Sequence, residues 1–326
     1  MARCRRLGYR ERTDCTSPGD REPGQEAPAI LRVESKKREF LVVGATGLVG
    51  SVLRDQLGDR AAGTSRKGGG DLFALDITDG NAVREAIEAM APRVVVLAAA
   101  LTAVDECERD PQASWAVNVG GTQNVAVACA RTGARLVFFS SDYVFGEGGP
   151  HPITADPDPL NVYGRHKLEA EKIVLAGVDG ALVVRTCNVY GYVPGGRNYA
   201  MSVLEALRAG RTVRAASDMF GNPTPAADLA RAVLEIVEAG GKGVAHLAGP
   251  DHVDRVTWAR RVAAAFGLDE GLIEPMSVAD LGQPARRPRR GGLDSSATCA
   301  EFGVHLGGLD EGLAQMAARA SAGQHT

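Results

Sequence analysis

Tyr163 and Lys167 are the two side chains of this sequence whose types and spacing could transfer a proton. They lie four residues apart, and in an α-helix two side chains at that spacing share one face. A phenol has a pKa of about 10, and a neighbouring ammonium group lowers it. The pair could therefore exchange a proton with a carbonyl or an alcohol. Of the six tyrosines, only Tyr163 has a lysine at this offset, and the alternative is that both side chains are simply solvated.

The composition is that of a globular protein without a dominant nucleic-acid surface. Hydrophobic residues make up 44% and charged residues 24% of the 326 positions, with a net charge of -3. The six cysteines form no C-x-x-C pair, and the histidines have no ligand spacing, so we expect neither a disulfide framework nor a metal site. No apolar run reaches the ~18 residues of a membrane span. These features predict a cytoplasmic protein with no nucleic-acid or membrane partner.

Residues 1–37 differ in composition from the rest of the chain. Arg, Glu, Asp, Pro and Gly dominate them, and they contain neither the apolar segment of a signal peptide nor the acid-poor composition of a transit peptide. Such a segment buries too little apolar surface to offset the entropy lost on ordering. We expect a disordered extension, or a start of translation assigned too far upstream.

A glycine-rich turn follows the first apolar run, at residues 39–43, and leads into an amphipathic segment. Strand, glycine turn and helix form the context in which such a turn binds a dinucleotide. Gly44 can make the tight turn, Gly47 lets the backbone approach a pyrophosphate, and Gly50 permits close helix–strand packing. The alternative is an ordinary strand–helix turn. The cofactor contacts predicted here are Gly44, Thr46, Gly47, Leu48 and Val49.

The end of the second predicted strand, at residues 61–65, bears on the choice of cofactor. Sites specific for NAD carry an acid about 20 residues beyond the first glycine, to bind the ribose 2′-hydroxyl. Here Ser65 and Arg66 stand at that place, followed by Lys67. A hydroxyl and two cations suit a 2′-phosphate, so we expect NADPH rather than NADH. Alternatively, Arg66 and Lys67 only open the glycine loop that follows.

Further apolar runs alternate with helical patterns and predict an α/β fold. The run at residues 93–100 is typical of a fully buried parallel strand, and the run at 134–139 brings Ser141 to a strand's carboxyl end, where ligands bind in such sheets. The alternation predicts a Rossmann-type, doubly wound parallel sheet. Asn118, in a helix expected at 114–132, should bind backbone groups of a neighbouring strand. Further cofactor contacts are expected at the strand ends, at Asp76, Ile77, Ala98, Ala99 and Ala100.

The glycine turn, the strand-end Ser141 and the Tyr163–Lys167 pair occur in the order that resembles the extended short-chain dehydrogenase/reductase family, from residue 39 onward. Within it, Ser-Ser-Asp-Tyr-Val-Phe-Gly at residues 140–146 is similar to the dTDP-4-dehydrorhamnose reductase branch, as is Asp-Met-Phe-Gly-Asn-Pro-Thr-Pro at residues 218–225. The resemblance implies an NADP(H)-dependent reductase of the 4-keto group of a nucleotide-activated 6-deoxysugar. It also implies that helices beside the sheet can pair into a homodimer.

The resemblance assigns catalytic roles to three residues. Tyr163 would donate a proton to the substrate carbonyl oxygen, and Ser141 would hydrogen-bond the same oxygen. Lys167 would lower the pKa of Tyr163 and hold the nicotinamide ribose. A hydroxyl that binds only its own backbone is the alternative for Ser141.

Two positions depart from related enzymes. Nucleotide-sugar dehydratases of this superfamily carry an acid where this chain has Tyr143, which argues against water elimination. The reductase branch typically carries a tryptophan where this chain has Asn188, which leaves the sugar and the nucleotide open. The arginines at residues 286–290 are expected to be structural. The candidate substrate contacts are Asp142, Tyr143, Asn188, Arg197 and Asn198.

We expect a nucleotide-binding domain at residues 38–185, to which residues 223–247 return, and a smaller substrate-binding part at 186–222 and 248–326. Two other functions remain open. One is a non-catalytic NADP-binding regulatory subunit like that of methionine adenosyltransferase, and the other is a nucleotide-sugar epimerase. An epimerase would keep its nicotinamide bound through gel filtration.

Overall fold

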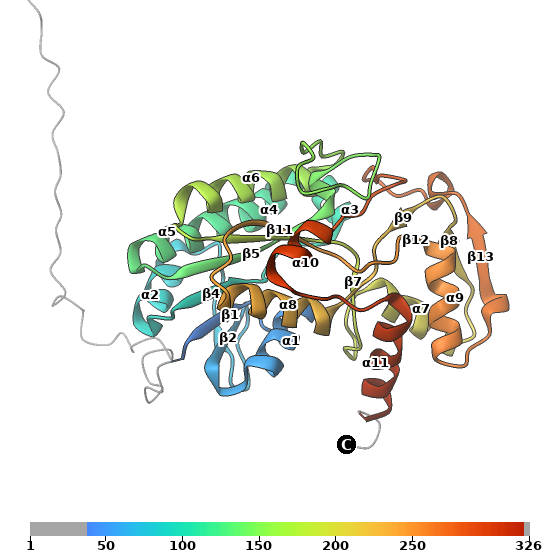
Figure 1. The fold of residues 1–326 in the computed structure, drawn as a ribbon, viewed down its shortest axis with the longest axis horizontal. Helices are drawn as coiled ribbons and strands as arrows, with labels where there is room; N and C mark the ends of the chain where they lie inside the picture. The colour runs from blue at the N-terminus through green and yellow to red at the C-terminus, as the bar shows by residue number, and fades with distance from the viewer. Residues whose placement is uncertain (1–37, 323–326) are drawn as a thin grey trace, which may run out of the picture. The chain divides into compact units, whose positions relative to one another are not determined.

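The computed structural model describes residues 38–322, so the extension expected at residues 1–37 lies outside it (Figure 1). Its centre is a seven-stranded sheet with the order β11-β6-β5-β4-β1-β2-β3. Every neighbouring pair of strands is parallel. The strands are β1 (Phe40–Val43), β2 (Ala61–Ser65), β3 (Phe73–Ala74), β4 (Val94–Leu97), β5 (Arg135–Ser141), β6 (Leu182–Thr186) and β11 (Gly243–Leu247). The expected doubly wound parallel sheet is confirmed.

Helices cover both faces of this sheet. On one face α1 packs against α8, and on the other α5 lies between α2 and α6 (Figure 1). A further helix, α10 (Ser296–Phe302), packs on the edge strand β11. The bounds of the covering helices are α1 (Leu48–Leu57), α2 (Gly80–Met90), α5 (Thr122–Thr132), α6 (Val162–Gly177) and α8 (Ala226–Glu238).

The helix expected at residues 114–132 is a composite of three segments. A π-helical turn, Ala116–Gly121, joins α4 (Pro111–Trp115) to α5, and α3 (Val104–Arg109) precedes them. Asn118 lies in this turn and makes two hydrogen bonds to Leu101, accepting from its N–H at 2.8 Å and donating to its carbonyl at 3.0 Å. Asn118 therefore fixes the backbone that follows β4, which confirms its expected structural role.

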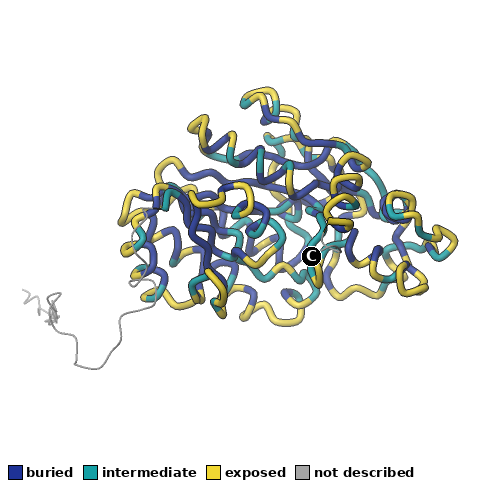
Figure 2. The backbone as a smooth tube through the Cα atoms, turned by 90° about the horizontal axis from the view of Figure 1, so that it is seen from below, coloured by how far each residue is buried: buried dark blue, intermediate teal, exposed yellow. Residues whose placement is uncertain are grey.

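The core of the sheet accounts for the apolar runs of the sequence. Both faces of β1 and β4 are covered by helices, so every residue of these strands is buried. Figure 2 shows that buried backbone runs through the interior of the fold and that exposed segments lie at its rim. Burying one Val or Leu side chain stabilises a fold by about 1.5–3 kcal/mol. Because β1 pairs with β2 on one side and with β4 on the other, the chain changes direction across the sheet at β1. In such folds the ligand crevice opens at the carboxyl ends of the strands at this point.

A second hydrophobic cluster lies around Trp258, which is buried. Its members come from helices and short strands that follow β6, among them the parallel pair β8–β13. Two-residue ladders, β7–β10 and β9–β12, belong to the same half of the chain. The elements are β7 (Val189–Tyr190), α7 (Tyr199–Arg208), β8 (Val213–Ala216), β9 (Phe220–Gly221), β10 (Thr224–Pro225), β12 (Val253–Asp254), α9 (Arg255–Ala265), β13 (Ile273–Met276) and α11 (Leu309–Ala322).

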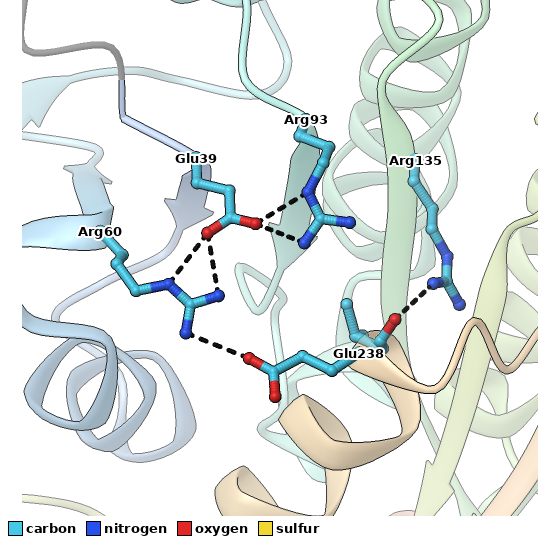
Figure 3. Close-up of polar contacts among 6 residues, drawn as sticks. Glu39, Arg60, Arg93, Arg135 and Glu238 are labelled. Atoms are coloured by element: carbon cyan, nitrogen blue, oxygen red, sulfur yellow. Dashed lines mark hydrogen bonds and ion pairs between the residues drawn. The ribbon is translucent and has the colours of Figure 1, made fainter.

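At the amino ends of the strands, away from the crevice, a group of charged residues joins elements distant in sequence (Figure 3). Glu39 accepts hydrogen bonds from Arg60 at 2.9 Å and from Arg93 at 2.8 Å, and Arg60 also binds Glu238 of α8 at 3.1 Å. Although burial raises the pKa of Glu39, the two arginines hold it below its usual value. Because these groups are partly exposed, each pair contributes at most about 1 kcal/mol.

Within residues 38–322, no helix is long and apolar enough to cross a membrane.

Candidate active site

The glycine turn after β1 is shaped by close contacts that exclude side chains. Gly44 has a φ of 90°, and a Cβ atom there would lie 2.5 Å from the backbone nitrogen of Ala99. A Cβ on Gly50 would lie 2.3 Å from the carbonyl oxygen of Gly44. Gly47, which precedes α1, would meet only the Gly44 oxygen, at 3.4 Å. The turn is therefore a glycine cradle that exposes the N-terminus of α1, the geometry that receives a pyrophosphate.

A cavity of about 490 Å³, which we call the inner cavity, extends from this turn along the carboxyl ends of β4 and β5 to α6. It brings together residues that are far apart in the sequence. The predicted site residues that line it are Thr46, Gly47, Leu48, Val49, Ala98, Ala100, Ser141, Asp142, Tyr143, Tyr163, Lys167, Asn188 and Arg197.

Other predicted cofactor contacts lie outside the inner cavity and have structural contacts. Asp76 accepts hydrogen bonds from the N–H of Thr78 at 2.9 Å and from its hydroxyl at 2.7 Å, which lower the pKa of Asp76 together with the charge of Arg66. Ile77 is buried against Gly121, and Ala99 packs against Gly44. Ser65 is buried at the end of β2, whereas Arg66, next to it, is exposed.

Local contacts fix the position of the Tyr163–Lys167 pair. Helix α6 begins after Asn161, whose side chain accepts a hydrogen bond from the N–H of Gly164 at 2.9 Å. Lys167 is 3% exposed and its Nζ donates to the carbonyl of Phe139 at 2.8 Å. This nitrogen is 5.9 Å from the centre of the Tyr163 ring. Ser141 donates to Asp142 at 3.0 Å and accepts from the N–H of Tyr143 at 3.2 Å.

Burial dominates the protonation of this site. It raises the pKa of Tyr163 well above its usual value, and the charge of Asp142 adds to this effect, while Ser141 opposes it. Burial also lowers the pKa of Lys167 to about 8, against the charge of Glu171. The expected lowering of the Tyr163 pKa by Lys167 stays a prediction, because in this structure burial sets the direction of the shift. The phenol of Tyr163 is therefore protonated at neutral pH.

A buried ion pair that no sequence motif predicted involves α6, the helix that carries Lys167. Glu171, one turn further along α6, accepts from Arg185 Nη2 at 2.7 Å and from Nε at 3.0 Å, and the hydroxyl of Ser140 also donates to it. Both charged side chains are at most 8% exposed. Glu171 could have been found from its spacing, because it lies on the same helix face as Tyr163 and Lys167.

A second cavity of about 710 Å³, the outer cavity, adjoins the inner one and shares Tyr143, Asn188 and Arg197 with it. Two carboxylates on its wall, Asp105 and Glu106, face a larger number of arginines. Those arginines are Arg109, Arg197, Arg214, Arg255 and Arg287. No local pattern marks Arg214 or Arg255 in the sequence, because neither belongs to a motif.

Arg287, from the run expected to be structural, binds Asp105 through two hydrogen bonds of 2.9 Å. This contact supports the expected role. The side chain of Asn198 caps α7, accepting from the N–H of Met201 at 3.1 Å and donating to the carbonyl of Gly191 at 3.0 Å. Its amide is therefore engaged within the protein, although the residue lines the outer cavity.

Asn188 has a left-handed backbone, with a φ of 47°, and lies where the two cavities meet. Its Oδ1 accepts a hydrogen bond of 2.6 Å from Arg255. Over residues 38–322, no group of three or more His, Cys, Asp or Glu side chains is placed to hold a metal ion.

Comparison with known proteins gives a consistent result over the length of the fold. The family model described as the RmlD substrate binding domain matches residues 38–322. The dTDP-4-dehydrorhamnose reductase of Mycolicibacterium smegmatis is 36% identical over 287 residues, 84% of this chain and 84% of that protein. The protein of the same name from Streptomyces griseus is 37% identical over 265 residues, 79% of this chain and 86% of that protein.

Among solved structures, dTDP-4-dehydrorhamnose reductase from Bacillus anthracis in complex with NADP superposes with a TM-score of 0.80. It is 25% identical, and the match covers 86% of this chain and 99% of that one.

Proposed function

The chain belongs to the RmlD substrate-binding-domain family of extended short-chain dehydrogenases/reductases, and from this premise we propose that it is an NADPH-dependent reductase of the 4-keto group of a nucleotide-activated 6-deoxysugar. The observation that carries the proposal is the inner cavity, which Ser141, Tyr163 and Lys167 line together with the glycine turn. A cofactor bound at the turn and a carbonyl beside the phenol would then be neighbours. The names of the relatives support the same substrate class.

The residues present fit NADP. The glycine cradle leaves room for a pyrophosphate at the N-terminus of α1, and the exposed Arg66 at the end of β2 offers a cation for a 2′-phosphate. When bound, NADPH supplies a hydride to a carbonyl carbon. The homologous structure from Bacillus anthracis that contains NADP supports this cofactor.

The protein chain itself would supply the proton that the carbonyl oxygen receives during reduction. Burial raises the pKa of the Tyr163 phenol, so it stays protonated at neutral pH. It would pass this proton to the carbonyl oxygen as that oxygen becomes a strongly basic alkoxide, and the phenolate left behind would lie beside Lys167. Ser141 would turn its hydroxyl from Asp142 to the same oxygen, and Lys167 would hold the nicotinamide ribose. General acid catalysis of this type accelerates a reaction by about 10²- to 10⁴-fold.

Tyr143 supports reduction without elimination of water. Burial raises its pKa to about 12, so the phenol stays neutral and cannot act as the carboxylate base of a dehydratase. The regulatory subunit and the epimerase remain rival functions. A complete set of proton-transfer residues in one cavity favours a catalyst over a regulatory subunit.

Formation of a homodimer stays a prediction. It rests on the resemblance and on two exposed apolar side chains of the neighbouring helices α5 and α6, Val127 (54% exposed) and Leu175 (42% exposed).

The test is the consumption of NADPH, followed by absorbance, with dTDP-, UDP- and GDP-4-keto-6-deoxysugars as substrates. We expect turnover of at least one substrate, and a decrease in kcat of about 10²- to 10⁴-fold in Tyr163→Phe. Retention of nicotinamide through gel filtration, without net oxidation of NADPH, would favour the epimerase. Cofactor binding without turnover of any keto-sugar would favour the regulatory subunit.

A further inference from the structure

Arg255, at the start of α9, is held rigidly before any ligand arrives. Its Nη2 donates to Asn188 Oδ1 at 2.6 Å, and its Cζ lies 4.8 Å from the ring centre of Tyr199 and 5.0 Å from that of Trp258. The Tyr199 hydroxyl also donates to the backbone carbonyl of Arg255 at 2.8 Å. An ordered guanidinium loses little conformational entropy when it binds an anion.

Arg255 acts electrostatically on the buried carboxyl of Asp142: burial raises the pKa of Asp142, and the charge of Arg255 opposes this rise. Among residues 38–322, Arg255 forms no ion pair with a carboxylate, whereas Arg287 on the same cavity wall is paired with Asp105. Its place in the first turn of α9 adds to the positive potential, because the N-terminal end of a helix dipole is positive. The preceding Asp254 is engaged in capping, through Val256 and Thr257.

Asn188 adds a second donor at the same place. Its Oδ1 accepts the hydrogen bond from Arg255, and its Nδ2 group, which lies next to Gly221, makes no hydrogen bond within the described part of the chain. The pair therefore has free N–H donors on both side chains and a positive charge on one of them. Such a surface selects a group with several acceptor oxygens and negative charge, and a phosphate is the simplest one.

The arrangement of the cavities indicates which phosphate group of the substrate would reach Arg255. With its carbonyl at Ser141 and Tyr163 in the inner cavity, a sugar would extend past Asn188, which lines both cavities. The group attached to the sugar would then enter the outer cavity, where Arg255 lies. In a nucleotide-activated sugar that group is the diphosphate.

We infer that Arg255 binds the diphosphate of the substrate, and that Asn188 is a positioning residue that holds the guanidinium toward it. The inference rests on the proposed function and deepens it.

The test measures the affinity of the full-length protein for a nucleoside diphosphate and for its nucleoside, by isothermal titration calorimetry. TDP with thymidine and UDP with uridine are the probes, and the diphosphate that binds wild type more tightly is kept. In Arg255→Gln we expect the Kd of that diphosphate to rise by about 10- to 100-fold, because a charge-assisted hydrogen bond is lost. The Kd of the nucleoside should stay within about twofold of wild type, since it carries no phosphate.

Asn188→Gly tests the positioning role, because glycine accepts the left-handed backbone while removing the amide. We expect about a 3- to 10-fold rise in the Kd of the diphosphate, with the nucleoside again unaffected. The matched control is Arg208→Gln, which removes an exposed arginine 5.6 Å from the ring of Phe266 and outside both cavities. It should bind both probes like wild type.

Three results would overturn the inference: equal diphosphate affinity in Arg255→Gln and wild type, equal losses for diphosphate and nucleoside, or no binding of either diphosphate by wild type. Failure of the proposed function is distinguishable from these. A protein that turns over no keto-sugar, yet binds a diphosphate through Arg255, would refute the reductase and leave this inference standing.

Discussion

The buried pair Glu171–Arg185, next to the inner cavity, contrasts with two arginines on the wall of the outer cavity. Behind the inner cavity, Glu171 and Arg185 are buried and neutralise each other at 2.7 Å. On the wall of the outer cavity, Arg214 is exposed, Arg255 is partly exposed, and neither has an ion-pair partner in the part of the chain that the structure describes. Arginine therefore stabilises the fold in the buried pair, whereas on the wall of the outer cavity it is available to bind a ligand.

The difference follows from the dielectric environment. A buried charge without a partner costs several kcal/mol, so the region around Lys167 must contain its own counter-charges. A partly exposed charge is solvated, and leaving it unpaired costs the fold little. An unpaired arginine at the edge of a cavity can thus attract an anionic substrate at little cost in stability. A buried arginine, in contrast, needs a carboxylate partner for the fold to be stable.

The largest effect is expected at the buried pair. Arg185→Met leaves the carboxylate of Glu171 buried with Ser140 as its remaining hydrogen-bond donor. We expect the free energy of unfolding to fall by about 3–5 kcal/mol, measured by urea denaturation.

The control is the double variant Glu171→Met with Arg185→Met, which removes both charges. It should be more stable than the single variant, because apolar residues of similar volume can replace a buried pair. A single variant within about 1 kcal/mol of wild type would mean that the pair is solvated, and the contrast between the cavities would fail.

A smaller effect on stability is expected at Lys167. Burial lowers the pKa of its ammonium group from 10.5 to about 8. Between these values the unfolded chain binds the proton and the folded protein does not, so this group makes the free energy of unfolding rise with pH. The variant Lys167→Met has no titratable group at this position. The difference in unfolding free energy between wild type and this variant should therefore grow by about 1–3 kcal/mol from pH 7.5 to pH 10.

Urea denaturation at several pH values measures this difference and cancels the titration of all other groups. A difference that is constant with pH would show that Lys167 stays charged and solvated. Lys167 would then be a solvated charge, like the arginines of the outer cavity.

The sequence predicted the parts of the fold with strong local patterns. The apolar runs at residues 39–43, 93–100 and 134–139 became central strands, because strands buried on both faces need continuous hydrophobic residues. Short ladders such as β9–β12 were not predicted, since two residues carry no periodicity. The π-helical turn at Ala116–Gly121 was also missed, because its sequence continues the helical pattern on either side.

The residues of the site also divide into those that local patterns predicted and those that they did not. Ser141, Tyr163 and Lys167 were predicted from the ends of regular elements, and the structure brings them to one cavity. Arg255 was missed because its contact with Asn188 depends on how α9 packs beside β7, which no local pattern encodes. The effect of burial on the pKa of Tyr163 was missed for a related reason, since spacing shows the nearby Lys167 but not the depth of the phenol.

The smallest effect is expected for Arg214, on β8 at the outer cavity. Its side chain is exposed and makes no hydrogen bond, ion pair or ring contact within residues 38–322. Arg214→Gln should therefore change the free energy of unfolding by no more than about 0.5 kcal/mol, measured in urea beside Arg185→Met. Because both substitutions remove one arginine, the gap between them isolates the effect of burial and pairing. A loss at Arg214 as large as that at Arg185 would show that the outer arginines hold the fold together, and the distinction between the two cavities would have to be abandoned.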